Sequence, residues 1–586
     1  MPKTPPLKSA ARKNQSGAFD LPSVLIGVSV VAILAIGVMA AVFGVIPWAQ
    51  DRAAKQDLAA LGTAQGAAYA RDGSFAGKTS LVGGGWLGQD TPGALQATAG
   101  ADGKCYVAVT TAQTGNKFIA SSANPAPRPL EAGDTWCSGT LISDPEPVMV
   151  STWDTGLAES CKEITLPVTG FKGTVDWGDG TRDAATRHTF KTTGKVDIRI
   201  DGTFTSWGGS GWADAACLTA VDRWGATGTA SLESAFADAD HLERVLSIPS
   251  TVTNMAQAFS GAESDFTLGM LDTANVTNMS SMFSGAAKFN SPVEFDTSKV
   301  TGMSGMFKDA TVFNQPVFFD TSRVTNMGAM FMSTKAFNQP VLFDTSKVTN
   351  MASMFDLTDS FNQPLDFDTS SAVNTAAMFS NARAFNQPVN FDTSKVTNMY
   401  AMFQHTISLN QPVRLNTSSV TDMRTMFSGA LIFNQPLDFD TSQVTTMVGM
   451  FYGAGKFNQP VNFDTSRVTL MTSMFKNAAS FNQPVPFNTS AVTSMDSMFY
   501  GASAFNKPVG FDTSAVTVMS SMFHLAASFN QPLKFDTSKV TSMNSMFYGA
   551  AAFNQDLSAW DVRQVASHEV FNSGTVWRLP MPAWIR

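Results

Sequence analysis

Cysteine and histidine are scarce in this chain, and their scarcity limits the chemistry that it can perform. Among 586 residues there are four cysteines and five histidines. The cysteines form no CxxC pair, and the HExxH, GxSxG and phosphate-loop spacings are absent from the sequence. We therefore expect no catalytic residues, no metal site and no cofactor, and we interpret the protein as a non-enzyme.

Positive charge is also sparse. The chain has 39 lysines and arginines against 47 aspartates and glutamates, which gives a formal net charge of -8. A protein that binds nucleic acid needs a clustered basic face to neutralise phosphates. The only cationic concentration lies between Lys3 and Lys13. The composition therefore argues against a nucleic-acid partner.

One apolar run follows that basic segment. Residues 21–48 contain no charge over 28 positions, whereas roughly 20 apolar residues are enough to cross a bilayer. Basic residues before such a run favour a cytoplasmic N-terminus. The sequence therefore predicts a transmembrane helix within residues 19–50, a membrane partner through that helix, and a single-pass cell-membrane protein with its bulk outside the cell.

All four cysteines fall on the predicted outer side, where disulfides form and persist. They are Cys105, Cys137, Cys161 and Cys217. We favour the pairs Cys105–Cys137 and Cys161–Cys217, because each pair would lie within or beside one compact segment. Free buried cysteines are the alternative.

The text around the apolar run, from Gly17-Ala18-Phe19-Asp20 to Pro47 and Gln50, resembles a type IV prepilin. The resemblance implies a basic leader over residues 1–18 and a peptidase cut between Ala18 and Phe19. Ser23 stands where pilins carry an assembly glutamate, which puts filament assembly in doubt.

Two strand-like runs, 106–110 and 117–120, are separated by a polar turn. They suit a small pilin-like α+β domain over residues 51–142. A plain membrane anchor with an unrelated small domain is the alternative.

Strand patterns at 163–167, 173–177 and 195–200 follow a proline-marked linker. Trp177-Gly178-Asp179-Gly180-Thr181 and His188-Thr189-Phe190 lie among them and resemble the signature of PKD domains. The resemblance implies a small immunoglobulin-like β-sandwich over residues 143–205.

The aspartates of this segment allow two interpretations. Asp179-Gly180 has the residues of a tight turn. Asp176, Asp179 and Asp183 offer oxygen ligands for a cation, but the spacing lacks the twelve-residue calcium loop and its closing glutamate. We favour the turn.

A 24-residue repeat fills most of the remaining chain and predicts a solenoid. Phe-Asn pairs begin at 289, 313, 337, 361, 385, 433, 457, 481, 505, 529 and 553, with Leu409-Asn410 in the one gap. We place the array at residues 261–560, with caps over residues 206–260 and 561–586.

Each copy predicts one strand and one short helix or turn. Val389 and Phe391 alternate with polar residues, whereas Val396, Met399, Met402 and Phe403 are three and four apart. Asp392-Thr393-Ser394 offers side-chain oxygens to cap the turn. Stacked coils would align Asn386 and its equivalents as an amide ladder. The regular methionines favour core packing over a copper site.

These copies resemble the repeats of BspA-like leucine-rich-repeat surface proteins, through Phe-Asn-Gln and Val-Thr-Asn-Met-x-x-Met-Phe. The resemblance implies a leucine-rich-repeat-like β/α solenoid of 24-residue coils on the cell exterior, with adhesion proposed for some relatives. The predicted fold class is thus multi-domain.

One outward position of the strand varies from copy to copy. It reads Glu294, Phe318, Leu342, Asp366, Asn390, Arg414, Asp438, Asn462, Pro486, Gly510 and Lys534. Phe318 and Leu342 would form an exposed apolar pair, and such pairs often mark contact sites. With Asp366 and Arg414 they are the candidate binding face. Unconstrained surface is the alternative.

The sequence thus predicts a membrane-anchored cell-surface protein that displays a solenoid for adhesion or for binding a protein or glycan. The alternative is a minor pilin or pseudopilin of a type IV pilus or type II secretion-like filament, with pilin-like subunits as partners.

Overall fold

The computed structural model describes residues 58–61, 64–65, 96–99, 106–111, 117–121, 127–129, 148–209, 211–269 and 271–584. They belong to two compact units, Met1–Pro145 and Glu146–Arg586, which are described separately. The predicted cleavage residues Ala18 and Phe19 lie outside the described residues. So do Cys105 and Cys137.

The localisation predicted from the sequence is corrected. Within the part of the chain that the structure describes, none of the helices combines the length and the apolar character that crossing a membrane requires. The apolar run at 21–48 lies outside the described residues. We therefore withdraw the single-pass membrane assignment.

The described strands of the first unit form an antiparallel sheet in the order β1-β2-β3-β4. Their bounds are Gln96–Ala99 for β1, Tyr106–Thr111 for β2, Lys117–Ser121 for β3 and Arg128–Pro129 for β4. The two runs predicted as strands are β2 and β3. Their apolar side chains, including Val107, Phe118 and Ile119, are buried.

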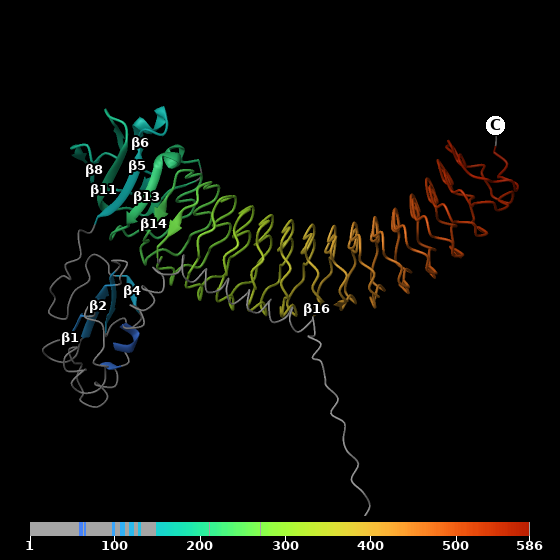
Figure 1. Ribbon diagram of the computed structural model, residues 1–586, viewed down its shortest axis with the longest axis horizontal. Helices are drawn as coiled ribbons and strands as arrows, with labels where there is room; N and C mark the ends of the chain where they lie inside the picture. Colours follow the sequence, from blue (N-terminus) through green and yellow to red (C-terminus); the bar gives the residue numbers. More distant parts are fainter. Residues whose placement is uncertain are drawn as a thin grey trace, which may run out of the picture. The chain divides into compact units, whose positions relative to one another are not determined.

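The second unit opens with a seven-stranded sheet in the order β15-β14-β13-β5-β11-β8-β9 (Figure 1). The strands are β5 Met149–Asp154, β8 Lys172–Asp176, β9 Arg182–Asp183, β11 Lys195–Thr203, β13 Leu218–Arg223, β14 Arg244–Val245 and β15 Thr267–Leu268. β13 pairs antiparallel with β5 on one edge and parallel with β14 on the other. The sheet therefore crosses the predicted boundary between residues 205 and 206 and joins the small domain directly to the first coils.

Short pairs and turns complete this region. β6 (Glu163–Thr165) pairs with β10 (Arg187–Thr189), and β7 (Val168–Thr169) pairs with β12 (Ser206–Trp207). Two 3-10 turns, η1 (Glu159–Lys162) and η2 (Ala213–Cys217), lie beside them.

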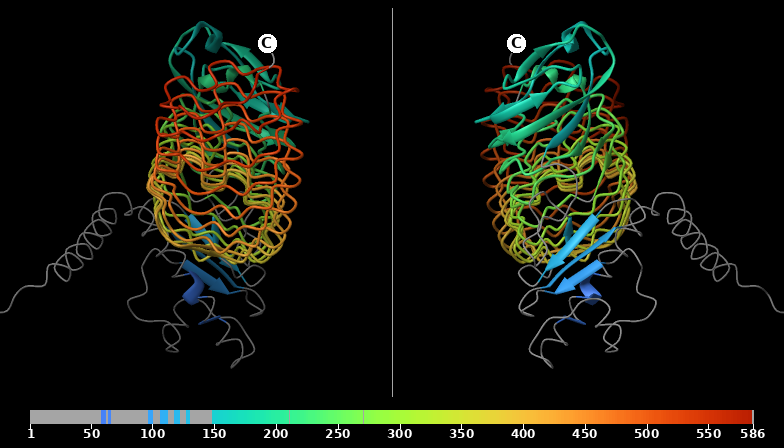
Figure 2. Two further views of the ribbon diagram at one scale, coloured as in Figure 1. Left: turned by 90° about the vertical axis from the view of Figure 1, so that its right-hand side faces the viewer. Right: turned by 90° about the vertical axis from the view of Figure 1, so that its left-hand side faces the viewer.

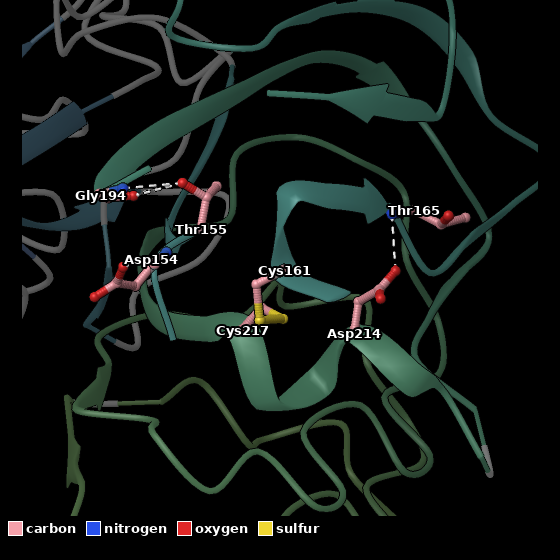
Figure 3. Close-up of a disulfide and its surroundings, with 8 residues drawn as sticks. Asp154, Thr155, Cys161, Thr165, Gly194, Asp214 and Cys217 are labelled. Carbon is pink, nitrogen blue, oxygen red and sulfur yellow. Dashed lines mark hydrogen bonds between the residues drawn. A yellow bond between two sulfur atoms is a disulfide. The ribbon is translucent and has the colours of Figure 1, made fainter. Parts of the chain in front are cut away.

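A disulfide joins the two 3-10 turns (Figure 3). It links Cys161 to Cys217, one of the pairs favoured from the sequence, and both cysteines are buried. The carboxylate of Asp214 in η2 accepts a hydrogen bond from the Thr165 N–H at 2.9 Å. The disulfide joins residues 56 positions apart in the sequence. It therefore fixes the start of β13 against the strands that precede it.

From Ser206 onward the chain winds into coils that stack in parallel. Bridges join Ser206, Ser231 and Asn254, then continue in 24-residue steps to Ser542 and end at Ser567. Seen from one end of the array, the coils lie one behind another and are displaced from one to the next, because the array is curved (Figure 2). A second parallel pairing, at another position of the coil, joins β16 (Val389–Phe391) to β17 (Val413–Leu415). We call residues 206–584 the coil array.

The methionine-rich part of each coil consists of two consecutive β-turns, which a third turn overlaps, as the Ser284 N–H donates to the Ser281 carbonyl at 3.0 Å. In one coil the Met282 N–H donates to the Met279 carbonyl at 3.2 Å, and the Ala286 N–H donates to the Phe283 carbonyl at 3.1 Å. The third residue of each turn, Ser281 or Gly285, has a φ of 54° or 76°. Such left-handed residues suit type II turns and end any helix. Of the two alternatives predicted for this part of the coil, a short helix or a turn, the structure has turns. The coils therefore lack the helix of a β/α solenoid, and no α-helix occurs in the described part of the second unit.

The left-handed positions carry strain where the residue is large. Leu357 has a φ of 59° and its side chain is 38 % exposed. We expect Leu357→Asn to raise the free energy of unfolding by about 0.5–1 kcal/mol, because asparagine tolerates this conformation better than leucine. Denaturant unfolding measures the change. Leu431→Asn, at a 50 % exposed position without a positive φ, is the control and should bring no gain.

Phenylalanine columns fill the core of the array. Phe283, Phe307 and Phe331 stack in successive coils with ring centroids 5.4 and 5.7 Å apart. The methionines of each turn are buried beside them. Two further columns contain Phe289 and Phe295. In one coil Leu409 and Leu415 stand in place of the phenylalanines of these two columns. No coil can bury its own rings, so each depends on its neighbours.

Candidate functional site

The outer column is the row of side chains at the position of Asn390 in β16 and at its equivalents every 24 residues, from Glu294 to Lys534. In β16 and β17 the middle residues Asn390 and Arg414 are exposed between two buried neighbours. Asp366 is exposed between the partly buried Leu365 and the buried Phe367. Since strand residues alternate between faces, the buried flanks force the middle side chain outward.

Phe318 and Leu342 are the most exposed large hydrophobic residues of the described chain, at 81 % and 79 %. Val317 and Phe319 flank Phe318 and are 2 % and 6 % exposed. A one-residue shift that buried Phe318 would expose both flanks, so the outward position is imposed by the core. The structure thus brings Phe318 and Leu342 together in adjacent coils. Arg414 lies in a more distant coil and does not join them.

A second row of exposed side chains lies beside the outer column, at the residue two positions after the outer-column residue of each coil. We call it the acidic column. It contains Asp296, Asp320, Asp344, Asp368, Asp392, Asp440, Asp464, Asp512 and Asp536. In the coil of Asp392 the carboxylate accepts a hydrogen bond from the Ser394 N–H at 3.0 Å. Bonds of this kind, from the N–H and hydroxyl of the serine two residues on, lower the pKa of Asp320 and Asp344. Asp320 and Asp344 are therefore ionised at neutral pH while they cap their turns.

The predicted asparagine ladder is confirmed. The Asn386 side-chain oxygen accepts the Asn410 N–H at 2.9 Å, and the same bond recurs between successive coils from Asn290 to Asn554. The ladder ends on the Arg578 N–H, which donates to Asn554 at 2.8 Å. Asparagine is used here to join coils rather than to bind a ligand.

The aspartates near Trp177 serve as turn acceptors. Asp176 accepts the Gly178 N–H at 3.0 Å, Asp179 the Thr181 N–H at 2.9 Å, and Asp183 the Ala185 N–H at 3.0 Å. Each carboxylate thus bonds to its own local backbone, in line with the turn interpretation. Among the described residues, no group of three or more histidine, cysteine, aspartate or glutamate side chains is arranged to hold a metal ion.

His188 adds a pH-dependent contact to this turn. Its Nε2 lies 2.8 Å from Asp179 Oδ2, and its ring stacks on Trp177 with centroids 4.9 Å apart. The hydrogen bond to His188, with that from Thr181, lowers the pKa of Asp179 from 3.8 to about 2.

We expect this pair to make the small domain acid-sensitive. Because the pKa of Asp179 is lower in the folded state, its contribution is complete above pH 3.8 and is lost as the pH falls to about 2. Melting temperatures across this window, followed by tryptophan fluorescence, should fall more steeply in the wild type than in Asp179→Asn. Equal slopes in the two proteins would show that the pair contributes nothing.

A second surface feature was missed by the sequence analysis. Five successive coils carry Tyr452, Lys476, Tyr500, His524 and Tyr548 at one position. The Lys476 ammonium lies 4.7 Å from the Tyr500 ring centroid, and the His524 ring lies 4.3 Å from Tyr500 and 4.7 Å from Tyr548. Burial lowers the pKa of His524. Alignment of the copies at this position would have revealed the stripe. Its ring faces cover one another, which favours a stabilising role.

Comparison with known proteins gives a family for the coil array. The family model described as "Mycoplasma protein of unknown function, DUF285" matches residues 230–340, 317–414, 389–486 and 485–584. No curated protein and no solved structure gives a match. The matched residues fall entirely within the coils and do not reach the segments that resemble prepilins or PKD domains. Since they cover more than half of the chain, this protein belongs to the DUF285 family of repeat proteins.

Proposed function

We propose that this protein is a surface protein without catalytic activity, whose coil array binds a protein or glycan partner and so mediates adhesion. The observation that carries the proposal is the outer column, which changes from coil to coil while the buried residues stay nearly constant. A solenoid scaffold of this kind offers a long surface that varies freely, because the core alone holds the coils together.

Two further features support the proposal. The Cys161–Cys217 disulfide fits an oxidising compartment rather than the cytosol. The polar groups of the turns and ladders bond to backbone within the array, as Thr393 does to the Asn416 carbonyl at 2.7 Å. They therefore act as structural elements, and the exposed columns are left for recognition.

The test is a binding screen of the full chain on protein and glycan arrays, repeated with Phe318→Ser combined with Leu342→Ser. Both side chains are exposed, so the variant should fold and melt like the wild type. We expect the strongest array signal to be lost in this variant and kept in a control, Asn462→Ser with Lys534→Ser. Binding that persists in the first variant would contradict the proposal for this face.

A further inference from the structure

The surroundings of Phe318 and Leu342 are acidic. Glu294 occupies the column one coil before Phe318, and Asp366 occupies it one coil after Leu342. Asp320 and Asp344 stand beside the apolar pair in the acidic column and are exposed. The apolar pair is thus bordered by carboxylates on at least three sides.

Two of these carboxylates, Asp320 and Asp344, have a pKa below the ordinary value for aspartate and are ionised at neutral pH. The serine two residues along each turn, Ser322 or Ser346, donates to the carboxylate and lowers the pKa of Asp320 or Asp344. The positive charge of Arg323 also lowers the pKa of Asp320, and that of Lys347 lowers the pKa of Asp344. Each of these cations follows its aspartate in the sequence, beyond the buried threonine of the turn. Residues 316–320 and 340–344, which carry the apolar pair and its neighbouring aspartates, contain no lysine or arginine.

Two exposed prolines, Pro316 and Pro340, lie on the other side of the apolar pair from the acidic column. Proline has no N–H, so these two positions add apolar area without a backbone donor. The carboxylates attract cations and repel phosphates. The chemistry therefore favours a cationic protein over a nucleic acid or an anionic lipid.

We infer that this face binds a protein segment in which apolar side chains stand between lysines or arginines. The inference rests on the proposed function and names the partner class of the same site. The apolar residues of such a segment cover Phe318 and Leu342, and its cations reach Asp320, Asp344 and the acids at the two ends. Charge complementarity of this type gives specificity and rapid association, and the apolar contact holds the complex.

The charge of the face can be removed without breaking the turns. Asn416 and Asn488 occupy the acidic column in two other coils and accept the same serine N–H, at 3.2 and 3.1 Å. Asp320→Asn with Asp344→Asn therefore keeps the turn geometry. Asp440→Asn with Asp464→Asn makes the same change in coils that lack the apolar pair and is the matched control.

The experiment titrates the full chain with a labelled synthetic peptide whose leucines and phenylalanine are flanked by lysines, and with the same peptide carrying glutamates instead. We expect only the lysine peptide to bind, with affinity about 30-fold lower for Phe318→Ser with Leu342→Ser, about tenfold lower for the Asp320 and Asp344 variant, and unchanged for the control. Raising the salt from about 0.05 to about 0.5 M should weaken binding further.

Three results would overturn the inference. They are equal binding of the two peptides, no binding of the lysine peptide, and binding that the Asp320 and Asp344 variant leaves intact. The proposed function fails separately: if an array ligand of another chemistry is lost with Phe318→Ser and Leu342→Ser, the face binds a partner and only its partner class is wrong. Melting temperatures of all variants, expected to match the wild type, show that loss of binding is not loss of folding.

Discussion

Replacing Phe451 with alanine is expected to lower the stability of the array by about 3–5 kcal/mol. The ring is fully buried and stacks on Phe427 and Phe475 of the neighbouring coils, with centroids 5.9 and 5.5 Å apart. It also lies 4.2 Å from Phe457. Because coils on both sides depend on this ring, the cavity cannot be closed by a local shift in one coil.

The measurement is amide hydrogen exchange under increasing denaturant, since long repeat arrays do not unfold in a single step. We expect protection to fall first in the coils between residues 427 and 475. Phe318→Ala removes the same group from an 81 % exposed position and should change stability by less than about 0.5 kcal/mol. Similar losses in the two variants would contradict the account of the core given above.

Removing the disulfide has the second large effect. Cys161→Ala with Cys217→Ala frees a loop of 56 residues in sequence separation, for which loop entropy predicts a loss of about 4 kcal/mol. Both cysteines are buried, and β13 begins at the residue after Cys217. Because β13 pairs with both β5 and β14, we expect the loss to spread into the first coils.

Fluorescence of the buried Trp153, Trp207 and Trp224 reports this unfolding directly. The reduced wild type should behave like the double variant, whereas exchange protection in coils beyond residue 500 should be unchanged in both. If the wild type melts identically with and without reductant, the bond does not stabilise this region.

Much of the array could be predicted from the sequence because every coil buries the same types of side chain at the same positions. The buried Val396, Met399 and Phe403 and the asparagine ladder through Asn386 follow from residues that recur at fixed positions. The family match shows the repeat protein but not what it binds. The outer column was identified because it varies, and its contacts with any partner stay a prediction.

The turns and the continuous sheet could not be predicted in this way. A spacing of three and four residues is common to a helical turn and to two successive β-turns, and only the left-handed Ser281 and Gly285 separate the two. The shared sheet depends on β14 and β15, two-residue strands whose partners lie more than 20 residues away. Such short, distant pairings leave no periodic pattern in the sequence.

The asparagine ladder has a consequence for the evolution of this protein. Each asparagine side chain accepts from the next coil while its own N–H donates to the coil before, as Asn410 does with Asn434 and Asn386. The same hydrogen bond can form between any two coils that carry this asparagine. A gene that gains or loses one whole 24-residue unit therefore leaves every remaining junction intact. The length of the array and the order of the outer-column residues can then change by recombination without any change in the core.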